Sequence, residues 1–187
     1  MKVAKGEQMS KTKLSAHLIA LMLLVSVVAG CKQLQSMASP TVLKSSDGKF
    51  QLTVPGGWHE NASLNDKAQI KGANPLEEMY VIVLTEAKSD FTNEMTLDEF
   101  TRITRDSIIS NVSSNDATQP RPVLINGNPG RQYEVEGVVK GVKLAYRVAT
   151  VETPEHFHQV ISWTLLSRKD KNENTLQKVI DSFRTTP

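Results

Sequence analysis

An apolar run that ends in a cysteine, residues 18–31, divides this chain into two parts and limits what can belong to a folded domain. Four lysines and one glutamate precede the run, and the small residues Ala29 and Gly30 close it. A basic start, a short apolar core and a small-residue end are typical of a secretory signal peptide. A stable membrane span needs about 20 apolar residues, and polar residues interrupt this shorter run. We therefore expect residues 1–30 to be removed.

Cys31 is the only cysteine of the chain, which excludes an intramolecular disulfide. Together with the three residues before it, Val28-Ala29-Gly30, it resembles the lipobox of bacterial lipoproteins. The resemblance implies cleavage between Gly30 and Cys31 and a diacylglycerol on Cys31, with a further acyl chain such as palmitate on its freed amine. Buried acyl carbons contribute about 0.8 kcal/mol each, so two or three chains hold a protein at a membrane without a spanning helix. The alternative, an unpaired buried thiol, is disfavoured by the position of Cys31.

The residue after the cysteine, Lys32, bears on which membrane would carry the protein. Where lipoproteins are sorted as in enteric bacteria, an aspartate at this place holds a protein at the inner membrane. Lys32 therefore predicts the cell outer membrane, with the domain facing the periplasm. In a Gram-positive cell the same anchor would hold the domain at the outer face of the plasma membrane, and this alternative stays open. Residues 9–30 alone would have a more usual signal length, which makes Met9 a candidate start.

Removal of the leader changes the charge balance of the chain. The full sequence has 22 basic and 20 acidic residues and a pI near 8.6. Without residues 1–30 it keeps 18 basic and 19 acidic residues, a formal charge of −1. The basic pI thus belongs to the leader and gives no indication of a nucleic-acid partner.

The rest of the chain consists of a tether and a domain. Residues 31–40 are polar and lack sustained periodicity, which predicts a flexible tether that follows the lipidated cysteine. Residues 41–187 suit a single domain, which is large enough to bury about two-thirds of the surface of its unfolded chain.

In the first half of this domain, the pattern of apolar residues predicts two strands followed by a helix. Residues 50–54 alternate as in a half-buried strand, whereas residues 79–84 are apolar on both faces, as in a central strand covered by helices. Thr96-Leu97-Asp98-Glu99 matches a capping box and begins a helix over residues 97–111.

Three strands with short turns and a second helix are expected in the last part of the chain. Residues 121–125 and 131–139 flank a turn at 126–130, Lys140-Gly141 makes the next turn, and the last strand covers 156–166. Apolar residues from Leu176 to Phe183 have helical spacing. This order predicts an α+β fold, an antiparallel β-sheet covered by helices. We expect Trp58 and Trp163 in its core.

These segments resemble PsbP-like domains. The resemblance rests on four motifs, which are FQLTVP followed by Trp58, TLDEF from Thr96, VLINGNPG from Val123 and VIDSFR from Val179. With a lipobox in front, the chain is similar to bacterial PsbP-like and DcrB-like lipoproteins. The resemblance covers nearly the whole mature chain and implies a PsbP-like α-β-α sandwich. It implies little about activity, because the fold serves photosystem assembly in plants, small-GTPase binding in eukaryotes and envelope roles in bacteria.

No catalytic pattern is found in the sequence. It has no Gly-x-Ser-x-Gly and no His-Glu-x-x-His motif, so we expect neither an enzyme nor a cofactor. His156 and His158, two apart on one strand, are weak candidates for metal ligands because their rings can point the same way. No third ligand is fixed by spacing, so two solvent-facing histidines are expected instead.

Two functions are compatible with this sequence. The first is a non-catalytic accessory or protein-interaction module, which is held at an envelope membrane through lipid on Cys31 and acts on an unknown envelope protein. The alternative is a periplasmic carrier or binder of a small apolar ligand in a cleft between sheet and helices. In both cases we expect a monomer.

Overall fold

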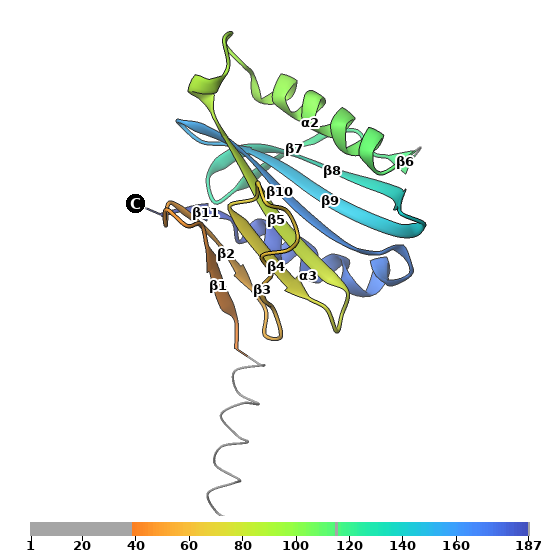
Figure 1. Cartoon of the computed structure of the whole chain (residues 1–187). Coiled ribbons are helices and arrows are strands. Elements are labelled where there is room, and N and C mark those ends of the chain that lie inside the picture. Colours follow the sequence, from red (N-terminus) through yellow and green to blue (C-terminus); the bar gives the residue numbers. More distant parts are fainter. Residues whose placement is uncertain (1–38, 115, 187) are drawn as a thin grey trace, which may run out of the picture. The chain divides into compact units, whose positions relative to one another are not determined.

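The computed structural model of the chain describes residues 39–114 and 116–186 (Figure 1). The predicted signal peptide, the cleavage site at Gly30 and Cys31, and the tether before Ser39 lie outside the described residues. From Pro40 onward the chain forms one compact unit. Among the described residues, no helix combines the length and the apolar character that crossing a bilayer requires.

An eight-stranded antiparallel sheet forms the centre of this unit, in the order β3-β4-β5-β10-β9-β8-β6, with β7 also pairing with β8. Its strands are β3 (His59–Glu60), β4 (Ile70–Asn74), β5 (Met79–Ala87), β6 (Asp116–Ala117), β7 (Arg121–Ile125), β8 (Asn128–Val139), β9 (Val142–Glu152) and β10 (His156–Leu165). A second, three-stranded sheet has the order β1-β2-β11 and contains β1 (Thr41–Lys44), β2 (Phe50–Val54) and β11 (Arg184–Thr185).

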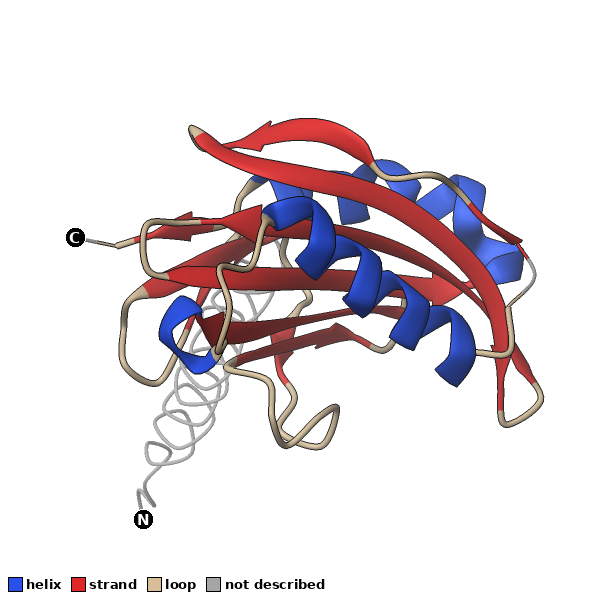
Figure 2. Ribbon diagram, turned by 90° about the horizontal axis from the view of Figure 1, so that it is seen from above, coloured by secondary structure: helices blue, strands red, loops and turns tan. Residues whose placement is uncertain are grey.

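Helices cover both faces of the large sheet. The two α-helices are α2 (Leu97–Asn111) and α3 (Lys169–Asp181), and short 3-10 helices cover Lys88–Asp90 and Leu166–Arg168. Figure 2 shows α2 lying along one face of the sheet, and Figure 1 shows α3 and the small sheet on the other side. The molecule is therefore layered as helix, sheet, and then helix together with small sheet.

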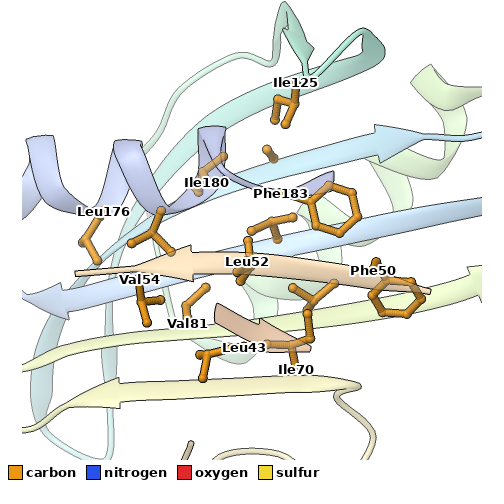
Figure 3. Close-up of a cluster of buried hydrophobic side chains, with 14 of the residues drawn as sticks. Leu43, Phe50, Leu52, Val54, Ile70, Val81, Ile125, Leu176, Ile180 and Phe183 are labelled. Atoms are coloured by element: carbon orange, nitrogen blue, oxygen red, sulfur yellow. The ribbon is translucent and has the colours of Figure 1, made fainter. Parts of the chain in front are cut away.

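The strand β5 shows why the sequence requires this layering. Val81 and Val83 point into a core cluster shared with the small sheet and α3, whereas Ile82 points into a cluster shared with α2. Figure 3 shows the first cluster, in which Leu52 of β2 and Ile180 of α3 approach the sheet from the same side. An apolar strand with two buried faces is stable only in the centre of a covered sheet, as the sequence predicts.

Local signals set the bounds of α2 and of the two tight turns. The helix begins after Thr96, whose hydroxyl accepts a hydrogen bond from the Glu99 amide over 3.2 Å. Asn126 and Lys140, each followed by a glycine, have φ near +49°, as a two-residue hairpin turn requires. The predicted turn over 126–130 is thus shorter than expected, because Asn128-Pro129-Gly130 already pairs with β7.

The two tryptophans differ in their burial. Trp58 is 5% exposed and belongs to the core shared with the small sheet. Trp163 is half-buried on the α2 side of the sheet, between Tyr80 and Tyr146, with ring centroids 5.4 and 6.0 Å away. Both side chains pack against a core cluster, but only Trp58 is enclosed by it.

Candidate functional site

The histidine pair lies on one face of β10, as predicted, with ring centroids 5.9 Å apart. The expectation that both rings face solvent is wrong for His158, which is 1% exposed. Its ring packs against Phe50 of β2 and Phe183, with centroids 5.1 and 4.9 Å away. The cause is the small sheet, which covers this face of β10 and which the sequence pattern does not predict.

Both ring nitrogens of His158 have hydrogen-bond partners. The Thr85 hydroxyl lies 3.0 Å from Nδ1, and the Thr153 hydroxyl lies 3.2 Å from Nε2. Because the Thr153 hydroxyl donates to the carbonyl of His156, it accepts from His158, so the neutral ring carries its proton on Nε2. Burial, together with the neighbouring His156, lowers the pKa of His158 from 6.5 to about 4. His158 is therefore a neutral, buried side chain whose two hydrogen bonds connect it to Thr85 and Thr153.

The geometry does not favour a metal site at this pair. Metal ligation by His158 would break one of its two hydrogen bonds to threonine. Within the described ranges, no group of three or more His, Cys, Asp or Glu side chains is placed to hold a metal ion.

Charged side chains connect the first part of α3 to the sheet, beside the apolar core. Arg147 of β9 contacts Glu134 of β8 over 2.5 Å, and Lys169 contacts Glu136 over 2.7 Å. Burial alone would raise the pKa of Glu134, but Arg147 and Lys169 hold it below its usual value. The hollow lined by Glu134, Arg147, Lys169 and Leu176, among others, measures about 20 Å³, which is the order of volume that a single water needs.

Two larger hollows open at the surface. One, of about 450 Å³, lies beside the β8–β9 hairpin and is lined by Val142, Lys143 and residues 165–167. The other, of about 270 Å³, lies between α2 and β8 and is lined by Arg102, Arg105, Arg131, Asp98, Thr101 and Gln119-Pro120. We call this second hollow the arginine pocket.

Two of the three guanidinium groups in the arginine pocket are held in place. Arg131 donates from Nε to the Asp98 carboxylate over 2.6 Å and from Nη1 to the carbonyl of Gly130 over 3.0 Å. Arg105 donates from Nε and Nη2 to the carbonyls of Thr118 and Ala117, over 3.1 and 3.3 Å. The third, Arg102, is 65% exposed.

Only part of the arginine pocket has a signal in the sequence. Arg102 and Arg105 are three apart on α2 and so share a face of the helix, which is a local signal. Arg131 reaches them only because β8 lies beside α2 in the fold. Its pairing with Asp98, 33 residues earlier in the chain, has no counterpart in the sequence pattern.

No known family model and no curated protein sequence matches this chain. Its structure, however, is similar to solved structures. Cyanobacterial PsbP (CyanoP) from Synechocystis sp. PCC 6803 is 13% identical, with a TM-score of 0.58 over 80% of this chain and 94% of that chain. LpqN of Mycobacterium tuberculosis, described as involved in cell envelope biogenesis, is 13% identical, with a TM-score of 0.59 over 79% and 91%. PA94 from Pseudomonas aeruginosa is 10% identical, with a TM-score of 0.51 over 79% and 98%.

Identities this low carry information on the fold alone. The similar structures share nearly their whole length with the compact part of this chain. The predicted α+β class, an antiparallel sheet covered by helices, is confirmed, and the chain has the PsbP-like fold.

Proposed function

We propose that this protein is a lipid-anchored envelope lipoprotein whose PsbP-like domain is a non-catalytic accessory or protein-interaction module. The observation that carries the proposal is where the hollows lie. Those of about 270 and 450 Å³ open at the surface. The space between the sheet and α3 is occupied by apolar core side chains, and the small hollow beside Arg147 and Lys169 measures about 20 Å³. A carrier of an apolar molecule needs an apolar cavity of a few hundred Å³.

Two further observations support this proposal. The two faces of the large sheet are occupied by core clusters that connect it to α2, α3 and the small sheet. This leaves the outer surface of the domain for contacts with other molecules. One of the similar structures, LpqN, is described as involved in cell envelope biogenesis, which agrees with a location in the envelope.

The interaction role is tested by crosslinking the protein in intact cells and identifying its neighbours by mass spectrometry. We expect the same protein neighbour in independent experiments, and we expect the purified protein to release no stoichiometric small molecule when it is denatured. Recovery of a bound apolar molecule that also raises the melting temperature would instead establish the carrier function.

The anchor is tested by membrane fractionation. We propose that Cys31 carries the lipid and that Lys32 directs the protein to the outer membrane, with the domain in the periplasm. Cys31→Ala should leave the membrane fraction or remain unprocessed, because one change removes every acyl chain. The wild-type protein should sediment with outer-membrane markers on a density gradient.

Lys32→Asp is the matched variant for this experiment, because it keeps the lipidated cysteine and changes only the sorting residue. It should move the protein to the inner-membrane fraction. A Cys31→Ala protein that is processed and still membrane-bound at high salt would contradict the anchor, and wild type found only with inner-membrane markers would contradict the outer-membrane assignment.

A further inference from the structure

We propose that the arginine pocket between α2 and β8 is a binding site for a phosphate group. This inference goes beyond the proposed function and stands without it. The pocket brings together three guanidinium groups, Arg102 and Arg105 from α2 and Arg131 from β8, around a hollow of about 270 Å³. Arg side chains bind phosphate and carboxylate oxygens by paired, charge-assisted hydrogen bonds.

The charges around the arginine pocket leave it positive. Asp98 balances Arg131, whose Nε lies 2.6 Å from its carboxylate. Asp106 lies 3.7 Å from Arg102 and 3.8 Å from Arg105, so it partly balances two guanidinium groups without hydrogen-bonding to either. Three cations against two carboxylates give a local charge of +1, which favours an anionic ligand.

The arginines retain donors that their protein partners do not use. In Arg131, the Nη2 amino group has no hydrogen-bond partner among residues 39–114 and 116–186, and Nε and Nη1 are occupied. In Arg105, Nη1 makes only the 3.8 Å contact with Asp106. A guanidinium has five N–H donors in a rigid plane, so each of these side chains can bind a ligand while its inner edge stays attached to the protein.

Preorganisation adds to this argument. The side chains of Arg105 and Arg131 are only 16% and 24% exposed. Backbone carbonyls of β6, of Thr118 and of β8 fix their positions. A ligand therefore loses little free energy to ordering them. Phosphate fits better than carboxylate because its oxygens can serve three guanidinium groups on different sides, whereas a carboxylate has two oxygens.

The test is a titration of the purified full chain in neutral detergent with two probes, which separate the sources of the group. Inorganic phosphate reports on a free phosphate, and dihexanoyl-phosphatidylglycerol below its micelle concentration reports on a lipid headgroup. Chloride at equal ionic strength corrects for screening. Binding of either probe with competition by the other supports the site, and the stronger probe identifies the source.

Arg102→Gln is the informative variant, because this exposed side chain makes only a 3.7 Å contact and its loss leaves the fold intact. It should weaken binding about tenfold, the effect of losing one hydrogen bond to a charged group. Arg131→Gln should weaken it at least as much, with the melting temperature measured in parallel. Arg121→Gln removes the same charge from an exposed position outside the pocket and should bind as wild type. Absence of binding, or equal weakening by Arg102→Gln and Arg121→Gln, would overturn the proposal.

Discussion

His158 is enclosed by two phenylalanine rings and two threonine hydroxyls, and this enclosure couples a single proton to the stability of the domain. Its pKa of about 4 in the folded state lies below the value of about 6.5 in an unfolded chain. Between these values the unfolded state binds more protons, so stability is complete above pH 6.5 and decreases as the pH falls toward 4. From pH 7 to pH 5 the free energy of unfolding should decrease by about 2 kcal/mol.

Urea denaturation at a series of pH values measures this dependence. His158→Gln should be less stable at pH 7 but should lose most of the decrease between pH 7 and pH 5. The neighbouring His156, whose ring is 5.9 Å away and which is more exposed, provides the control. Because burial is the main cause of the lowered pKa of His158, His156→Gln should keep most of the decrease in stability. If His158→Gln retained the wild-type pH dependence, another group would be responsible.

At the scale of secondary-structure elements, the end of α2 and the strand β8 lie so close together that Gly137 of β8 has no room for a side chain. A Cβ there would meet the carbonyl oxygen of Val112 and lie 2.6 Å from its Cγ2. The same carbonyl accepts a hydrogen bond from the Val138 amide over 2.6 Å, which ties the end of the helix to the strand. Gly137→Ala should therefore displace the end of α2 and destabilise the domain by about 1–3 kcal/mol.

Hydrogen exchange separates this local effect from a general loss of stability. The Val138 amide should exchange faster in Gly137→Ala, and the core amides of β5 and β10 should change less. Gly141→Ala in the adjacent turn is the comparison: it has no neighbour within 4 Å but a φ of +82°, so its cost is local strain. A Val138 amide that stays protected in Gly137→Ala would show that β8 and α2 adjust without separating.

Elements whose signals are local could be predicted from the sequence, and those that depend on distant partners could not. The helix over Leu97–Asn111 has its predicted bounds because the Thr96 cap directly precedes it and its apolar stripe lies within it. By contrast, β11 has two residues and no periodicity, and it exists because β2 pairs with it. The burial of His158 also depends on distant partners, since its ring is covered by Phe50 of the small sheet and by Phe183. The arginine pocket as a whole has no signal in the sequence because Arg131 comes from a different element than Arg102 and Arg105.

At the scale of the whole molecule, the start and the end of the domain are joined by strand pairing and hydrogen bonds. Gln51 of β2 pairs with Arg184 of β11. The Ser182 hydroxyl accepts a hydrogen bond from the Thr53 amide, 129 residues away in the chain, over 2.9 Å. The Asn126 side-chain amide donates to the carbonyl of Phe183 over 2.7 Å. The small sheet therefore forms fully only when β11, from the end of the domain, pairs with β2 near its start.

These contacts between the start and the end of the domain affect how the chain folds. Contacts between residues far apart in sequence form slowly, because a long loop must close before they contribute any stability. Since a protein is synthesised from its N-terminus, β2 is made long before the strand that completes its sheet. Until then Leu52 and Val54, which are fully buried in the finished domain, remain exposed on a newly made chain, where they can associate with other chains or with a chaperone.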